Sequence, residues 1–257
     1  MGSEVTSQLS INTLSGIPMV KQGDDLAELI LDSLKRDELS LQSGDIVVVA
    51  QKIVSKAEGR LIRLKDVTPS EEALTLASET EKDPRLVQLT LDESTKVVRQ
   101  KPGILIVRHR LGHIGANAGI DQSNIEDDDE YALLLPEHPD LSAENLKRKL
   151  DIALNCDLGV LITDSHNRPW RMGTIGGAIG CAGFQVIDDR RGLSDLFGRE
   201  LKVTLINRAD AIAALATLLM GETTEKTPVA LVRGFPVDSE SGTAGDINRP
   251  IEDDLFQ

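Results

Sequence analysis

The stretch Ile46-Val47-Val48-Val49-Ala50 is apolar at every position and mostly β-branched, and the rest of the chain can be organised around it. A strand with one face in water alternates apolar and polar side chains, whereas a strand covered on both faces is apolar throughout. The stretch therefore predicts a strand buried on both faces. Residues 158–162, Leu-Gly-Val-Leu-Ile, predict a second strand of the same kind.

Helices are predicted where leucine and alanine recur at helical spacing between these strands. Asp24 and Ser142 are the predicted N-caps of two of them, and Pro69 and Pro84 suit the first turns of two others. The predicted helices cover residues 25–36, 69–80, 84–92, 143–155 and 208–220. Further strands are expected at residues 97–98, 104–110, 201–206 and 229–234. Five glycines between residues 173 and 183 lack the dinucleotide-binding spacing and predict tight strands with close backbone packing.

Composition narrows the classes of partner. The 257 residues allow one large domain or two small ones, and the net charge of −14 opposes binding to nucleic acid. No run approaches the roughly 18 apolar residues of a membrane span, and no signal peptide is visible, so we expect a cytoplasmic protein that binds neither nucleic acid nor membrane. Cys156 and Cys181 lie among apolar or small residues and are expected to be buried free thiols.

A polar stretch at residues 117–124, Asn-Ala-Gly-Ile-Asp-Gln-Ser-Asn, follows the predicted strand at 104–110. Asp121, Ser123 and Asn124 offer three oxygen-bearing side chains within four positions, which suits a hard cation such as Mg²⁺. An ordinary Asx-type turn has the same composition. This stretch alone favours the turn.

Three other stretches change that balance. Gln51 to Arg60 carries Lys52 and Lys56 directly after the first buried strand, either as a phosphate site or as a solvated strand end. Asp164 and Ser165 end the second buried strand, followed by Arg168 and Arg171, which add further positive charge. Glu222 follows the last helix, where Gly221 is also a plain C-cap candidate. One metal-dependent nucleotide site would account for Asp121, Asp164 and Glu222 together.

The order of these motifs along the chain is similar to that in the coenzyme F420-0:L-glutamate ligase family. The resemblance covers most of the chain and rests on seven groups of residues. They are Gly16-Ile17-Pro18 with Gly23-Asp24-Asp25-Leu26, residues 55–60 (Ser-Lys-Ala-Glu-Gly-Arg), residues 117–121 with Ser123-Asn124, residues 162–165 (Ile-Thr-Asp-Ser), Arg171 with Gly173, residues 198–201 (Gly-Arg-Glu-Leu), and residues 218–222 (Leu-Leu-Met-Gly-Glu).

The resemblance implies a set of site residues. Asp121 and Asp164 would bind one divalent metal ion, Ser165 and Glu222 would help bind a second, and Lys56, Asp121 and Asp164 would be the catalytic residues. The implied ions are Mg²⁺ or Mn²⁺, with K⁺ as a further candidate. The implied nucleotide contacts are Ile17, Pro18, Met19, Val20, Gln51, Lys52, Lys56, Asn124, Met220, Gly221, Glu222, Thr223, Thr224, Glu225, Lys226 and Thr227. Two segments depart from the family pattern: Gln51-Lys52 stands where Ser-Thr is common, and residues 223–226 replace a glycine-rich stretch.

The resemblance also implies an activity and an architecture. GTP would phosphorylate the terminal carboxylate of coenzyme F420-0, L-glutamate would attack the acyl phosphate, and further γ-linked glutamates would follow. The implied fold is α+β, with mixed sheets, packed helices and two subdomains in a single catalytic region over 1–257, and the implied assembly is a homodimer. We place an inserted smaller subdomain near residues 67–150 and expect no fused nitroreductase-like domain. Two other classes remain open: a metal-dependent nucleotide hydrolase or kinase, and a non-catalytic nucleotide-binding protein.

Overall fold

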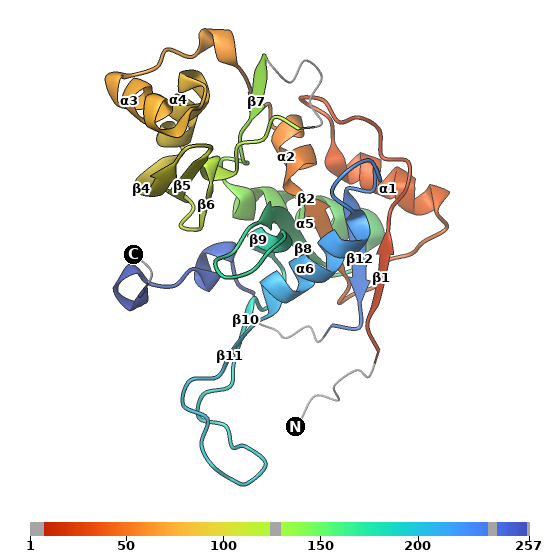
Figure 1. The fold of residues 1–257 in the computed structure, drawn as a ribbon. Coiled ribbons are helices and arrows are strands. Elements are labelled where there is room, and N and C mark those ends of the chain that lie inside the picture. The colour runs from red at the N-terminus through yellow and green to blue at the C-terminus, as the bar shows by residue number, and fades with distance from the viewer. Residues whose placement is uncertain (1–7, 124–129, 236–240, 256–257) are drawn as a thin grey trace.

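The computed structural model describes residues 8–123, 130–235 and 241–255, and it confirms the predicted α+β class. Its centre is a five-stranded mixed sheet with the strand order β1-β12-β2-β8-β9 (Figure 1). Strands β2 and β8 run parallel, with Ile46 opposite Gly159, and the other neighbours are antiparallel. The strands are β1 Ser10–Thr13, β2 Ile46–Ala50, β8 Gly159–His166, β9 Ile175–Ala182 and β12 Val229–Arg233.

Helices cover both faces of this sheet. Val47, Val49 and Val160 pack in one apolar cluster with α1 (Leu26–Arg36) and α5 (Pro139–Leu154). Ile46 and Val48 point the other way, into a cluster with α6 (Arg208–Met220). Every side chain of β2 from Ile46 to Val49 is therefore fully buried, which confirms the prediction made from its unbroken apolar run.

A small lobe lies to one side of the sheet and is formed by elements between β3 and β7 (Figure 1). It has apolar clusters of its own, built around residues such as Val87, Leu105 and Leu64. Its elements are β3 Leu61–Arg63, η1 Leu64–Asp66, α3 Glu71–Thr80, α4 Pro84–Asp92, β4 Ser94–Lys101, β5 Ile104–His109, β6 Ile114–Ala116, η2 Asn117–Gly119 and β7 Tyr131–Leu133. The subdomain limits near 67 and 150 stay a prediction.

The structure corrects several local predictions. The basic stretch after β2 is no strand end: helix α2, Gln51–Ala57, begins at once, and Ala50 at its N-cap position makes no side-chain hydrogen bond. Asp25 caps α1 in place of Asp24, because its carboxylate accepts a hydrogen bond from the Ala27 amide. Helix α5 begins at Pro139 and so already contains Ser142. In place of the strand expected over 201–206, the structure has only the short strand β11, Leu205–Asn207, which pairs with β10, Ile187–Asp189.

The glycine-rich segment forms β9, which lies between α5 and α6, and the predicted close packing is confirmed. A side chain at Gly176 would overlap the carbonyl of Ala213 and the hydroxyl of Thr217 on α6. On the other face, a Cβ atom at Gly180 would lie 2.5 Å from the carbonyl oxygen of Pro139. The absence of side chains at these positions lets both helices approach the strand backbone.

The remaining elements lie at the periphery. The segment between β10 and β11 projects from the body as an arm (Figure 1). The C-terminal segment contains η3 (Ala244–Ile247) and η4 (Ile251–Asp253). Cys156 and Cys181 are free thiols, as predicted, but only Cys181 is buried, and Cys156 is partly exposed. None of the helices described is long and apolar enough to cross a membrane.

Candidate active site

Asp121 and Lys52 form an ion pair where α2 meets the small lobe. Asp121 is fixed by a two-way backbone bridge to Leu133 in β7, and the Lys52 ammonium lies 2.5 Å from its carboxylate. Lys52 also donates to the backbone oxygen and hydroxyl of Ser123, at 3.1 and 3.0 Å. Burial raises the pKa of Asp121, but the Lys52 ammonium and the Ser123 amide outweigh it, and the net pKa is lowered. Asp121 is therefore held as a carboxylate.

Asp164 lies near the end of β8 with only 14% of its side chain exposed. Burial raises its pKa, His166 opposes this, and the negative charges of Asp121 and Glu222 raise it further. These electrostatic effects mean that three carboxylates from distant parts of the chain act on one region. Asp121 and Glu222 therefore lie near enough to Asp164 to influence its charge, while their joint role at one metal site stays a prediction.

Ser165 and Glu222 join the end of β8 to the segment after α6. The Ser165 hydroxyl donates a 2.5 Å hydrogen bond to the Glu222 carboxylate, across 57 positions of sequence. This contact depends on the tertiary arrangement, since β9, β10, β11 and α6 lie between the two residues in the chain. It brings together the two residues that the family resemblance assigns to a second metal ion.

The side chains of this region carry oxygen donors of the kind that a divalent ion needs. Carboxylate and hydroxyl oxygens are the hard ligands that Mg²⁺ and Mn²⁺ accept, and a cation near Asp164 would offset the repulsion that raises its pKa. Among the residues described, no three Asp, Glu, His or Cys side chains are grouped closely enough to hold a metal. The Lys52 ammonium neutralises Asp121 instead. The residues fit the ions in chemistry, and the four metal roles stay predictions.

The residues predicted to contact the nucleotide differ in how deeply they are buried. Ile17 and Val20 are buried in the main core, whereas Met19 is 65% exposed. Pro18 is exposed, and Lys56 lies on the last turn of α2. Gln51 is buried, and its amide oxygen accepts a hydrogen bond from Ser55. Asn124 lies outside the residues described.

The loop after α6 is held by its own hydrogen bonds. The Glu225 carboxylate accepts from the amide and hydroxyl of Thr223, and the Thr227 hydroxyl donates to the backbone oxygen of Met220. Gly221 and Lys226 both adopt positive φ angles, of 76° and 57°. Helix α6 ends at Met220, and residues 221–227, which include Glu222 and Thr224, form a bent loop.

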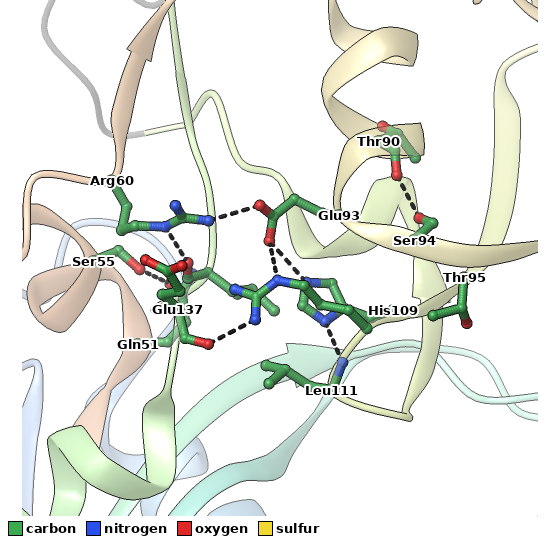
Figure 2. A network of polar contacts seen from close by, with 12 residues as sticks. Gln51, Ser55, Arg60, Thr90, Glu93, Ser94, Thr95, His109, Leu111 and Glu137 are labelled. Atoms are coloured by element: carbon green, nitrogen blue, oxygen red, sulfur yellow. Dashed lines mark hydrogen bonds and ion pairs between the residues drawn. The ribbon is translucent and has the colours of Figure 1, made fainter. Parts of the chain in front are cut away.

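Sequence reasoning missed Glu93, which follows α4 and is buried. Its carboxylate accepts hydrogen bonds from Arg60 at 2.8 Å and Arg110 at 3.0 Å, and His109 lies 3.4 Å away (Figure 2). Burial raises its pKa, but His109, Arg60 and Arg110 outweigh this and lower it to about 2. Local pattern gave no signal for this cluster, because its members come from separate elements.

Comparison with known proteins identifies the family of this chain. The sequence profile of the family described as F420-0:Gamma-glutamyl ligase matches residues 16–234. The chain belongs to this family. It is 43% identical over 252 residues to the coenzyme F420:L-glutamate ligase of Methanothermobacter thermautotrophicus, covering 97% of this chain and 99% of the relative.

Two further relatives carry the same name. That of Methanopyrus kandleri is 46% identical over 221 residues, which is 86% of this chain and 85% of the relative. That of Archaeoglobus fulgidus is 41% identical over 251 residues, which is 97% of both. The family match begins at Gly16 and ends at Gly234, and so it includes every predicted metal residue.

Proposed function

We propose that this protein is a GTP-dependent ligase that joins L-glutamate to coenzyme F420-0 and then adds γ-linked glutamates. The observation that carries the proposal is the 43% identity, over 97% of the chain, to a relative named coenzyme F420:L-glutamate ligase. The electrostatic influence of Asp121 and Glu222 on Asp164, together with the Lys52 ammonium beside Asp121, supports a metal-dependent site for a charged nucleotide.

The reaction needs activation of a carboxylate, because a carboxylate is a poor acyl donor to an amine. Transfer of the γ-phosphoryl group of GTP to the terminal carboxylate of F420-0 gives an acyl phosphate and GDP. The amine of L-glutamate then attacks the acyl carbon, phosphate leaves, and an amide forms with loss of a proton. This sequence requires no covalent intermediate on the protein.

The residues have distinct tasks in this scheme. Lys52 and Lys56 would bind phosphate oxygens of the nucleotide. Asp121 and Asp164 would bind one divalent ion, and Ser165 and Glu222 would help bind a second. Two Mg²⁺ or Mn²⁺ ions, with K⁺ as a further candidate, would supply charge neutralisation along the phosphates. Lys52 would exchange its contact with Asp121 for the nucleotide, since one ammonium cannot neutralise both fully. We also propose a cytoplasmic homodimer.

The proposal is tested by mass spectrometry of protein incubated with F420-0, L-glutamate, GTP and either Mg²⁺ or Mn²⁺. A gain of one or more glutamyl units with matching GDP release supports it, and a parallel incubation with ATP tests the nucleotide. Asp164→Asn should lower turnover by at least about 100-fold while thermal unfolding stays cooperative. The control is Asp32→Asn, on the exposed face of α1, which should keep wild-type turnover.

Two outcomes would each contradict one part of the proposal. Wild-type turnover in Asp164→Asn would contradict the role of Asp164 as a metal ligand. Nucleotide hydrolysis that ignores both F420-0 and L-glutamate would favour the hydrolase or kinase alternative.

A further inference from the structure

Three histidine rings lie in a row between the small lobe and the end of β8. The rings of His109 and His113 are stacked, with centroids 4.9 Å apart and planes at 7°. The His113 ring also meets that of His166, with centroids 5.3 Å apart and planes at 51°. His109 ends β5, His113 precedes β6, and His166 ends β8, so His113 connects the two parts of the protein.

The His109 end of the row is firmly anchored. Its ring is buried, and its Nδ1 atom accepts a 3.0 Å hydrogen bond from the Leu111 amide (Figure 2). Its other nitrogen faces Glu93, which Arg60 and Arg110 hold in place. A ring fixed on two sides in this way gives His113 a stable surface to pack on.

The His166 end lies against the candidate active site. Its Nδ1 atom is 3.9 Å from the Asp164 carboxylate. A side chain at Gly177 on β9 would overlap the His166 ring, so that ring is confined between β9 and His113. The position of His166 next to Asp164 therefore depends on the ring that covers its other side.

The His113 ring is suited to this place because it stays neutral. Burial lowers its pKa to about 3, and the neighbouring His109 and His166 lower it in the same direction. A neutral ring stacks on its neighbours without placing a positive charge between them.

We propose that His113 is a positioning residue, whose ring fixes His166 against β9 and thereby aligns the Asp164 segment with the small lobe. The proposal rests on the ligase function, because the effect of misalignment is measured on that reaction. A displacement of a site element by about 1 Å can cost up to 100-fold in rate, and it should act on kcat more than on the KM for nucleotide.

The first test compares His113→Ala with His113→Phe, which keeps a flat ring without nitrogen atoms. His113→Ala should lower kcat by about 10-fold with the KM for GTP changed less than about twofold, and His113→Phe should restore most of kcat. The control is His138→Ala, since His138 is exposed and stands at the start of α5. Unchanged kcat in His113→Ala would overturn the proposal, as would equal losses in the Ala and Phe variants when both unfold cooperatively.

The second test needs neither metal nor substrate. The chain has four histidines, so their ring signals can be resolved by NMR in selectively labelled protein. The His166 signal should move in His113→Ala and stay close to its wild-type position in His113→Phe, with His138 as the internal reference. An unmoved His166 signal in His113→Ala would refute the positioning role. If the wild-type protein makes no glutamylated product, the ligase proposal fails while this measurement still decides the structural part.

Discussion

Glu93 provides a direct test of how the small lobe is joined to the rest of the protein. The perturbation is Glu93→Gln, which keeps the size of the side chain and removes its charge. In the folded protein the pKa of Glu93 falls from 4.5 to about 2, since the hydrogen bonds and charges of His109, Arg60 and Arg110 outweigh burial. At 1.36 kcal/mol per pH unit, this difference is worth about 3 kcal/mol of folding free energy at pH 7.

The dependence on pH follows from the direction of this pKa change. Because the folded pKa lies below the unfolded one, the stabilisation is fully present above pH 4.5 and is lost as the pH falls through about 2. The free energies of unfolding of wild type and Glu93→Gln should therefore differ by about 3 kcal/mol at pH 7, and by about half of that at pH 3.

The assay is urea-induced unfolding followed by circular dichroism at pH 7, 5, 4 and 3. The matched control is Glu130→Gln, since Glu130 pairs with Arg63 at 3.4 Å and both side chains are exposed; it should lose less than about 1 kcal/mol at pH 7. Equal stability of Glu93→Gln and wild type at pH 7, or a difference that stays constant down to pH 3, would refute the reasoning.

Two further predictions concern the packing of the large sheet. Gly176→Ala should destabilise the protein by about 1–3 kcal/mol, because the new methyl group would overlap the backbone of α6. The measurement is thermal unfolding, and the control is Gly115→Ala, because Gly115 has open space around it. Equal melting temperatures of the two variants would contradict the prediction. Asp45→Ala should lower the free energy of unfolding in urea by about 2 kcal/mol, since the buried carboxylate of Asp45 accepts two hydrogen bonds from Arg233. A decrease no greater than that of the control Asp32→Asn would contradict this prediction.

Several features of the fold could be predicted from local sequence. The unbroken apolar runs of β2 and β8 identified two strands of the central sheet, because only strands buried on both faces lack polar positions. Periodic leucine and alanine positions gave α1, α3, α4 and α6 within a few residues. The glycines of β9 indicated close packing, because the absence of Cβ atoms is itself a local property.

Helix α2 shows where local pattern was insufficient. No side chain caps its first residue, and it follows β2 without a turn, so the basic stretch could equally end a strand. Ile53 and Val54 of α2 are buried in the main apolar cluster, and such tertiary contacts override weak local signals.

For the candidate site, too, one part was determined by the sequence and another by the tertiary structure. The sequence by itself determined which oxygen-bearing and basic residues follow the buried strands, and their order along the chain indicated the ligase family. Only the tertiary structure decided that Lys52 pairs with Asp121, that Ser165 meets Glu222, and that His113 stands between His109 and His166. Periodicity reports which face of an element is buried, whereas contacts between distant elements depend on sheet order and lobe packing, to which no local pattern corresponds.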